Sequence, residues 1–438
     1  MRVLIVTQIF IPEMGALANR LYPIARQLVE AGHEVSVATC MPNYPEGVVF
    51  PEYRGKLFLR ETVDGANILR TACYTAPRNR SKWSQLGNYL SFIPAAFHSA
   101  LQAGKPDVVL VSSPSLFAVI PAICLAKLRG AKLVFDIRDL WPDELIGYGG
   151  MHEGSLAVRV LRVVERWGYR SADCIVGTTQ AILDTVIERG AAPDKTVFVP
   201  NGADLELFRP LPPDNPITRE YPFGDRFVAM YSGLFGIKHG IELILETADL
   251  LREHKEIVFF LLGNGPRREA LTKLSESMGL DNVIFGGERN VREVPSVLAR
   301  ADVCLTVVQP GRCSKKVNSV KTFEYMACEK PVVLASDEAG VPLLEESGGG
   351  IVVPPQDARA MADAILALRH DPERRALMGE RGRRFVEENY SRSVWAERLE
   401  KTMRNLWPAE QKDKASYHVK PEAQYAEPGV YLSETIGE

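Results

Sequence analysis

The chain has 438 residues, 46% of them apolar, and a formal net charge of −3. This length exceeds what one hydrophobic core usually organises, so two domains are expected. The small net charge excludes a general attraction to nucleic acid. The sequence offers no apolar run long enough for a membrane span or a signal peptide. Its seven scattered cysteines contain no CxxC pair and are typical of a reduced, cytoplasmic protein.

Short β-rich runs alternate with helical patterns through the first half of the chain. Apolar residues recur at helical spacing between the first two runs and predict a helix from Leu17 to Ala31. Strands that alternate with helices are typical of a parallel α/β sheet. The expected strands are Arg2–Thr7, Glu34–Thr39, Asp107–Ser112, Lys132–Ile137, Cys174–Gly177 and Thr196–Pro200.

A proline-rich segment, residues 206–225, interrupts this alternation. Neither a helix nor a central strand continues through its prolines, so we interpret it as a linker that follows a first domain of residues 1–205. The alternation then restarts and predicts a second domain, residues 226–391, with a helix from Gly240 to Glu253. Its expected strands are Phe227–Tyr231, Ile257–Leu262, Val283–Phe285, Val303–Val307, Pro331–Ala335 and Gly350–Val353.

Helical patterns from Pro355 to Trp407 close the globular part. The last of these helices, about 392–408, is expected to pack back on the first domain. The remainder, 409–438, is polar and interrupted by prolines, which predicts a disordered tail.

The segment SVKTFEYMACEKPVV, from Ser319 to Val333, carries most of the functional information. Lys321 and Glu324 lie one turn apart on the predicted helix. A helix start with Ser319 and Lys321 favours phosphate, and Glu324 is placed to accept hydrogen bonds from two neighbouring hydroxyls. A phosphate site beside a diol acceptor suits a ribonucleoside diphosphate. Taken alone, Lys321 and Glu324 would be interpreted as an ion pair on a solvated helix. The other motifs therefore decide between that interpretation and a nucleotide site.

Those motifs occur in a characteristic order. They read VTQIFIPEMGALANRLYPIARQLVEAGHEVSVAT, KLVFDIRDLWPDEL, VPNGADLELFRP, YSGLFGIKHG, LLGNGPRRE and SVKTFEYMACEKPVVLASDEAG. Over residues 1 to 407 the ordered set resembles the retaining nucleotide-sugar glycosyltransferases of family GT4. The resemblance implies the α/β GT-B fold, with two facing Rossmann-like domains that have parallel sheets. The first domain would bind the acceptor and the second the nucleotide-sugar donor.

The Asp-Leu-Trp-Pro and Lys-Thr-Phe-Glu-Tyr-Met-Ala motifs are most similar to bacterial L-N-acetylfucosaminyl-transferase-like enzymes of surface polysaccharide synthesis. One position departs from the family pattern. The family has a glutamate eight positions before Glu324, and this chain has Lys316 there. The usual carboxylate contact to the donor sugar is therefore absent or supplied elsewhere, which leaves the sugar identity open.

The resemblance implies transfer without a metal or another cofactor, so protein cations must neutralise the departing diphosphate. Lys238 and Lys321 are the candidates, together with Glu324 and Asp139 as further catalytic residues. Lys238 lies in a glycine-bounded turn, where an exposed loop lysine is the alternative interpretation. The run from Gly311 to Ser319 adds Arg312, Lys315 and Lys316, which are either a phosphate or acidic-acceptor contact or a solvated loop.

Small residues after predicted strands mark the rest of the donor site. Gly263, Asn264 and Gly265 follow a strand at its carboxyl end, where open α/β sheets bind ligands, although a plain tight turn would look the same. The loop from Gly286 to Pro295 resembles the family's base-recognition loop. The further donor-binding candidates are Gly15, Ala16, Gly233, Ser319 and Gly340.

The acceptor-side candidates lie in the first domain. They are Arg20, one turn into the first helix, and the charged residues Asp136, Arg138 and Asp143 beside Asp139 around Trp141. Buried acids beside an arginine are often structural pairs, which is the alternative here. His33 and His239 are expected to be turn or loop residues, and no spacing predicts a metal site.

The function implied is transfer of a sugar, with retention of configuration, from a UDP-linked donor to a lipid-linked or glycan acceptor. The sugar would be a hexose or an N-acetylaminosugar. A UDP-N-acetylglucosamine 2-epimerase and a silent nucleotide-sugar-binding subunit are the alternatives; a nicotinamide dehydrogenase is disfavoured, because no GxGxxG follows the first strand.

Residues 78–102 combine basic and aromatic residues. They predict either a core helix, broken at Pro94, or a site that attaches the protein to the inner face of the cytoplasmic membrane.

Overall fold

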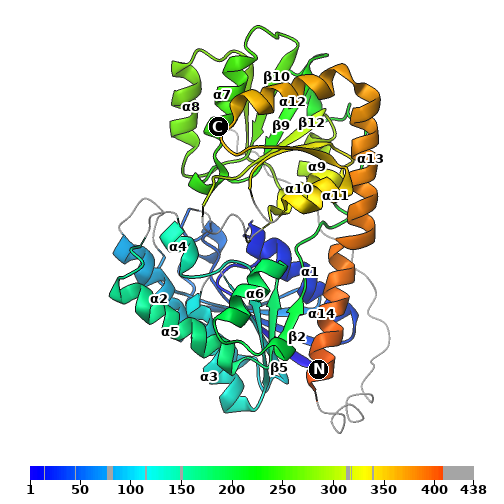
Figure 1. Ribbon diagram of the computed structural model, residues 1–438. Coiled ribbons are helices and arrows are strands. Elements are labelled where there is room, and N and C mark those ends of the chain that lie inside the picture. Colours follow the sequence, from blue (N-terminus) through cyan, green and yellow to red (C-terminus); the bar gives the residue numbers. More distant parts are fainter. Residues whose placement is uncertain are drawn as a thin grey trace, which may run out of the picture.

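A computed structural model describes residues 1–407, apart from 14, 45, 76–81, 114–115, 148–150, 312–315, 317 and 338–339. Two α/β domains are stacked end to end, each built around its own sheet (Figure 1). The prediction of two facing domains with parallel sheets is confirmed. The expected tail, 409–438, lies outside the described residues.

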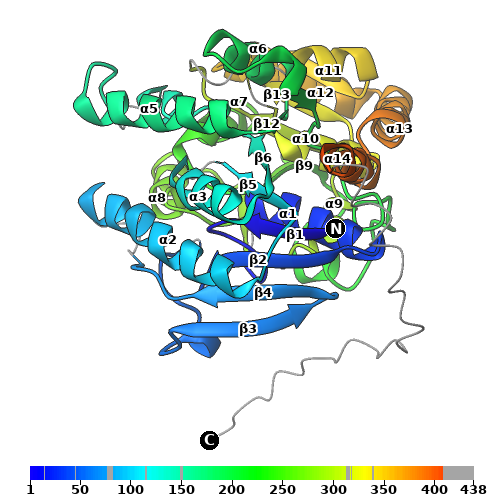
Figure 2. The same ribbon diagram turned by 90° about the horizontal axis from the view of Figure 1, so that it is seen from below.

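The first sheet has eight strands in the order β3-β4-β2-β1-β5-β6-β7-β8, and Figure 2 shows its first strands from below. All neighbours are parallel except β3 and β4, which form an antiparallel pair. The strands are β1 (Arg2–Val6), β2 (Glu34–Cys40), β3 (Phe58–Val63), β4 (Ala66–Thr71), β5 (Val108–Ser112), β6 (Lys132–Ile137), β7 (Cys174–Gly177) and β8 (Thr196–Phe198). The β3-β4 pair was not predicted. β3 is an edge strand whose residues alternate between exposed and half-buried positions, whereas β4 lies inside the sheet and is mostly buried.

Helices cover both faces of this sheet. They are α1 (Ala16–Glu30), α2 (Lys82–Gln102), α3 (Val119–Arg129), α4 (Asp143–Gly147), α5 (Leu156–Ser171) and α6 (Gln180–Glu188). The prediction that Pro94 breaks its helix is wrong, since α2 runs through it without interruption. Pro94 lies on the exposed side of α2, so water can reach the carbonyl that loses its hydrogen bond.

The second sheet is parallel throughout, in the order β11-β10-β9-β12-β13-β14. Its strands are β9 (Phe227–Ser232), β10 (Ile257–Leu262), β11 (Val283–Gly287), β12 (Val303–Val307), β13 (Val332–Ala335) and β14 (Gly350–Val353). The helices are α7 (Glu242–Leu250), α8 (Arg268–Ser277), α9 (Val294–Leu298), α10 (Val320–Ala327), α11 (Val341–Ser347), α12 (Ala358–His370) and α13 (Pro372–Asn389). Short 3-10 turns lie at Pro51–Tyr53, Leu116–Ala118, Pro193–Lys195, Thr218–Glu220 and Ile237–His239.

Each sheet separates two hydrophobic clusters because successive strand residues point to opposite faces. In β1, Leu4 and Val6 pack into one cluster, whereas Val3 and Ile5 pack into the other. The central strands are buried on both faces, which explains their continuous apolar sequences.

The last helix, α14 (Arg392–Leu406), returns to the first domain and packs against α1 (Figure 1). His33 lies 2.7 Å from Glu400 of α14, and Glu400 also pairs with Arg404. The chain crosses between the domains twice, and the two crossings touch. Ala203 and Ser391 form an isolated β-bridge, and a Cβ added at Gly202 would lie 2.1 Å from the carbonyl oxygen of Tyr390. We refer to this paired crossing as the hinge.

Candidate functional site

The carboxyl ends of the two sheets face each other across the boundary between the domains (Figure 1). Loops at these ends bind ligands in open α/β folds. The predicted site residues divide between the two sides of this interdomain boundary, which is called the cleft below. Those of the second domain lie in the loops after β9 and β10 and at the starts of α10 and α11.

Lys321 reaches from α10 over the end of β9. Its Nζ donates a hydrogen bond to Tyr231 Oη at 2.7 Å and lies 3.9 Å from the centre of the tyrosine ring. Gly233 follows directly, with φ +147°, and a Cβ there would come within 2.9 Å of the Lys321 ammonium. The structure therefore brings Lys321 and Gly233 together, and a small residue at 233 leaves room for the cation.

Glu324 lies one turn further along α10 and pairs with Arg392 at the start of α14, with Oε1 and Nη2 3.5 Å apart. Burial raises the pKa of the Glu324 carboxyl, while Arg392 and then Lys321 oppose this shift. Arg392 also donates to the carbonyl of Gly202 at 2.8 Å. The glutamate predicted to accept hydrogen bonds from a diol is therefore attached to the hinge.

The predicted glycine loops pack on each other through their backbones. A Cβ added at Gly263 would lie 2.0 Å from the carbonyl oxygen of Gly233, and one at Gly265 would lie 2.7 Å from that of Phe235. Asn264 accepts a backbone hydrogen bond from Phe235 at 2.8 Å. This contact between loops already requires glycine, so the glycines alone do not demonstrate a ligand.

Two further donor-side candidates begin helices. Ser319 is the N-cap residue of α10, and the backbone N–H of Thr322 donates to its carbonyl oxygen at 3.1 Å. Gly340 is the N-cap residue of the short helix α11.

Lys238 crosses the cleft. Its Nζ lies 3.0 Å from Oε1 of Glu144, which belongs to α4 of the first domain. The adjacent His239 is half-buried, and the loss of solvent around its imidazole, together with Lys321 and Lys238, holds the pKa of the imidazole well below the usual range. Lys238 is thus part of an interdomain ion pair, and the neighbouring imidazole is neutral at physiological pH.

Lys316, which replaces the family glutamate, contacts α6 of the first domain. Its carbonyl accepts a hydrogen bond from Thr179 Oγ1 at 2.5 Å, and its Nζ donates to Thr185 Oγ1 at 2.8 Å. Arg312 and Lys315, from the same predicted basic run, lie outside the described residues.

The structure corrects the acceptor-side prediction for Arg20 and Asp136. The two residues form a bidentate pair in the interior, with Nη2 and Oδ1 2.8 Å apart. Arg20 also donates to the carbonyls of Val199 and Pro200, at 3.0 and 3.1 Å, so it ties α1 and β6 to the segment before the hinge. With these donors engaged, Arg20 stabilises the fold and is not available to an acceptor.

Asp143 is also a structural residue. Arg162 of α5 and Arg189 beyond α6 both pair with its carboxylate, which lowers the pKa of Asp143 against the opposing effect of burial. Glu165 joins the same arginines and completes a network between α4, α5 and α6. The prediction that Asp143 contacts the acceptor does not fit this arrangement.

Arg138 and Asp139 remain on the cleft side of β6. The backbone N–H groups of both residues point to Ser113 Oγ, at 2.8 and 3.4 Å. Asp139 is half-buried and faces Glu144. Burial raises the pKa of Glu144, and the negative charge of Asp139 raises it further.

Gly15 is the N-cap residue of α1 and packs on Tyr44, because a Cβ there would meet the tyrosine ring at 3.0 Å. Ala16 is the first residue of α1. The buried Glu13 organises this loop, since it accepts hydrogen bonds from the backbone of Phe10, Asn43 and Tyr44, and burial raises its pKa to about 7.

Sequence reasoning missed four residues of the cleft and its loops, listed here: Glu13, Glu144, Tyr231 and Arg392. Glu144 directly follows a predicted residue, and its position in KLVFDIRDLWPDEL was an available signal. The other three carry no local pattern, because their partners come from distant parts of the chain.

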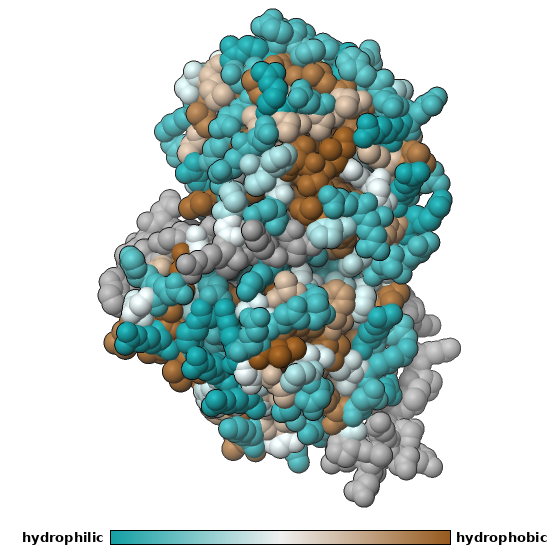
Figure 3. All heavy atoms as spheres, in the orientation of Figure 1, coloured by the Kyte–Doolittle hydropathy of each residue, from teal (hydrophilic) through white to brown (hydrophobic). Residues whose placement is uncertain are grey.

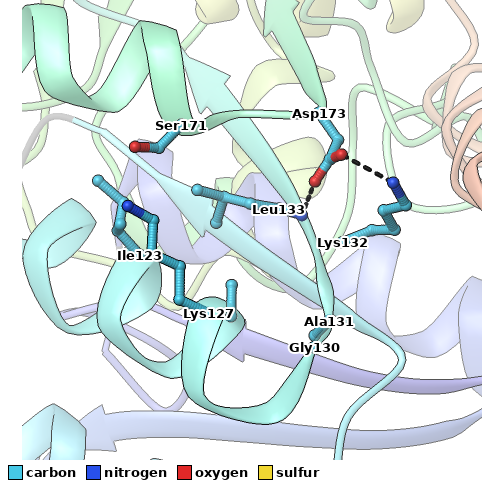
Figure 4. Close-up of a pocket in the computed structure, with 9 residues that line it drawn as sticks. Ile123, Lys127, Gly130, Ala131, Lys132, Leu133, Ser171 and Asp173 are labelled. Atoms are coloured by element: carbon cyan, nitrogen blue, oxygen red, sulfur yellow. Dashed lines mark hydrogen bonds and ion pairs between the residues drawn. The ribbon is translucent and has the colours of Figure 1, made fainter.

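A separate pocket of about 290 Å³ lies at the opposite, amino-terminal edge of β6 (Figure 4). Asp173 in its wall pairs with Lys132 at 2.9 Å and accepts a hydrogen bond from the Leu133 backbone at 2.9 Å. Asp173 and Lys132 therefore already have partners, and the pocket is remote from the cleft. Among the described residues, no three His, Cys, Asp or Glu side chains are grouped as a metal site requires.

Family models match most of the chain. A glycosyl transferase 4-like domain matches residues 15–202, and the glycosyl transferases group 1 domain matches residues 216–385. WcaI of Escherichia coli, named as a colanic acid biosynthesis glycosyl transferase, is 27% identical over 83% of this chain and 91% of its own length. The α-D-kanosaminyltransferase of Streptomyces kanamyceticus is 28% identical over 63% of this chain and 71% of its own length.

Solved glycosyltransferase structures share the fold. Sucrose-phosphate synthase of Thermosynechococcus elongatus superposes with a TM-score of 0.73 and 18% identity, over 92% of this chain and 98% of that one. HepE of Anabaena, in complex with UDP, superposes with a TM-score of 0.66 and 16% identity, over 92% of this chain and 100% of that one.

Proposed function

Because this chain belongs to the GT-B glycosyltransferases of family GT4, we propose that it transfers a sugar from UDP to a glycan or lipid-linked acceptor of a surface polysaccharide, with retention of configuration. The observation that carries this proposal is the grouping of Lys321, Gly233 and Glu324 at the carboxyl edge of the second sheet. The Lys321 cation and the backbone at Gly233 would bind a diphosphate, and the Glu324 carboxylate would bind the ribose joined to it.

The diphosphate would lie near the Lys321 ammonium and the first turn of α10. Lys238 is the second cation near this position. It would break its ion pair with Glu144 in order to bind the diphosphate. Cations placed where negative charge develops on the leaving group lower the barrier to transfer, because the charge is stabilised most in the transition state. No other cofactor is required by this proposal.

UDP is our proposed donor nucleotide because HepE, which shares the fold, is described in complex with UDP and with UDP-glucose. An N-acetylaminosugar is proposed only on the resemblance of the Asp-Leu-Trp-Pro and Lys-Thr-Phe-Glu-Tyr-Met-Ala motifs. Lys316 turns toward Thr185 of the first domain, so it does not replace a carboxylate that would contact the sugar.

We also propose that the protein binds an anionic membrane surface through α5. Leu156, Val160 and Val163 are 77%, 52% and 66% exposed and recur at helical spacing on one face of this helix. Arg159, Arg166 and Arg170 are also exposed on α5. Hydrophobic atoms gather at the lower left of Figure 3, over this part of the first domain. Apolar side chains with adjacent arginines suit an anionic interface.

The same structure argues against α2 as the anchor. Phe92 is fully buried, and Tyr89 packs on Phe117 and Trp141 at ring distances of 6.0 and 5.4 Å. Within the described residues, none of the helices is both long and apolar enough to cross a bilayer. The prediction that the aromatic residues of 78–102 face a membrane is therefore wrong at Phe92.

A panel of nucleotide sugars tests the proposal. UDP-sugars should raise the melting temperature of the protein, and the stabilising donor should be turned over when a glycan or lipid-diphosphate sugar acceptor is added. The anomeric proton of the product, read by NMR, reports retention. Incubation with donor alone should give no epimer. Binding without any transfer to an acceptor would instead support a silent nucleotide-sugar-binding subunit.

A further inference from the structure

Arg138 is a buried cation whose guanidinium has no hydrogen-bond partner among the described residues. It is 7% exposed and follows directly after β6, at the end of the sheet that faces the cleft. Within the part of the chain that the structure describes, its guanidinium has no hydrogen-bond acceptor, and Nε is buried without a partner. Buried charges are normally paired, because an unpaired one loses its hydration without compensation.

The neighbouring acids are already engaged elsewhere. Asp136 is held by Arg20 through both oxygens and by Ser112 at 2.7 Å, and Glu144 is paired with Lys238. Asp139 is the remaining acid close by, and it is the largest influence that keeps Arg138 charged. Burial and the positive charge of Arg20 act in the opposite direction and lower the pKa of Arg138. An anion is the ligand that this environment lacks.

We propose that the Arg138 guanidinium binds a phosphate group of the acceptor substrate, which makes the acceptor a phosphate-linked sugar such as a lipid-diphosphate sugar. A guanidinium presents paired N–H donors that match the oxygens of a phosphate. This inference rests on the proposed transfer reaction and names the class of its second substrate.

The position of Arg138 favours the acceptor over the donor as the source of this phosphate. The cations that face the proposed donor, Lys321 and Lys238, belong to the second domain, and so do the start of α10 and the glycine loops. Arg138 belongs to the first domain, beside Asp139, which is the predicted group for the acceptor hydroxyl. One acceptor molecule would meet both residues, with its phosphate on Arg138 and its sugar at Asp139.

The experiment compares two probes on the wild-type protein and on Arg138→Met and Arg138→Lys. Farnesyl diphosphate and farnesol share a lipid chain, so their difference in affinity reports the diphosphate alone. With UDP present, the wild type should bind farnesyl diphosphate more tightly than farnesol. Arg138→Met should lose about tenfold or more of the affinity for farnesyl diphosphate, Arg138→Lys should retain part of it, and farnesol should bind all three alike.

The melting temperature of the ligand-free protein separates this role from a structural one. Removing an unpaired buried charge should raise it in Arg138→Met, by about 2 to 4 °C, whereas loss of a structural arginine would lower it. A lower melting temperature in both variants would overturn the proposal.

Three binding results would also overturn it. The first is equal affinity of the wild type for the two lipids, and the second is unchanged binding of farnesyl diphosphate by Arg138→Met. The third is a matching loss of UDP affinity, which would assign Arg138 to the donor. A wild type that binds no UDP-sugar contradicts the proposed donor, whereas the farnesyl comparison tests Arg138 alone.

Discussion

Lys238 Nζ of the second domain lies 3.0 Å from Glu144 Oε1 of the first, so this ion pair spans the cleft in which the proposed donor must bind. The same ammonium is a proposed contact of the donor diphosphate. Donor binding and the interdomain pair therefore compete for one cation.

Replacing Glu144 with glutamine should release Lys238 to the donor. The lysine is 44% exposed, so the pair is a weak one, and UDP affinity should rise by about two- to fivefold. Calorimetry with UDP measures this. In a Lys238→Met background the Glu144→Gln change should have no further effect. Unchanged or weaker UDP binding by Glu144→Gln alone would show that the pair does not compete with the donor.

Glu324→Ala tests the proposed diol contact. Each charge-assisted hydrogen bond to a ribose hydroxyl contributes about 1.5 to 3 kcal/mol, so UDP affinity should fall by about tenfold or more. Glu345→Ala, an exposed acid on α11, is the matched control and should leave the affinity unchanged. A folded Glu324→Ala protein that binds UDP like the wild type would contradict the assignment.

The elements of both sheets were predictable because their strands are continuous apolar runs between helical patterns. The edge strand β3 was not, since it has no such run, and the internal strand β4 beside it was also missed. Lys321, Gly233 and Glu324 follow from local sequence, because a strand end and a helix start place them. Tertiary packing sets the partners of the two acids. Glu144 pairs with Lys238, 94 residues away in the chain, and Asp143 pairs with Arg189, 46 residues away. No periodicity encodes such distances, so Asp143 was predicted as a binding residue and Glu144 was missed.

Arg392→Gln should change the pH dependence of donor binding. Glu324 faces Arg392 of α14, Lys321 of its own helix and Asp204 of the hinge. Burial already raises the Glu324 pKa, and Arg392 opposes this, so its removal should raise that pKa further. Donor binding needs the ionised carboxylate and is lost as pH falls through this pKa.

The pH at which half of the UDP binding is lost should therefore be higher in Arg392→Gln than in the wild type. UDP titrations between about pH 5 and 8 measure this midpoint. Arg392→Lys should keep the midpoint near that of the wild type. A midpoint that stays fixed in Arg392→Gln would contradict the coupling, even if the variant were less stable, because a purely structural role leaves the pH profile in place.

Lys321→Ala tests whether protein cations neutralise the leaving group. If the contact of Lys321 strengthens as the diphosphate departs, kcat should fall by roughly a hundredfold, while the exposed Lys273→Ala control retains full activity. Treatment with EDTA should leave the wild-type rate largely intact. Loss of activity on chelation, restored by magnesium or manganese, would show that a metal ion performs this task.

The α5 surface should determine membrane binding. Vesicles with anionic lipids should carry the wild type in flotation at low salt, and less of it at high salt, since the attraction between the α5 arginines and the lipid is screened. A Val160→Ser, Val163→Ser double variant removes exposed apolar area and should float less. The matched control is Leu377→Ser, which changes an exposed leucine on α13 of the second domain. Equal flotation of the double variant and the control would exclude α5 as the anchor. A wild type that stays in the soluble fraction at low salt would exclude the membrane hypothesis altogether, because the exposed apolar face and the arginines would then have failed under the most favourable conditions.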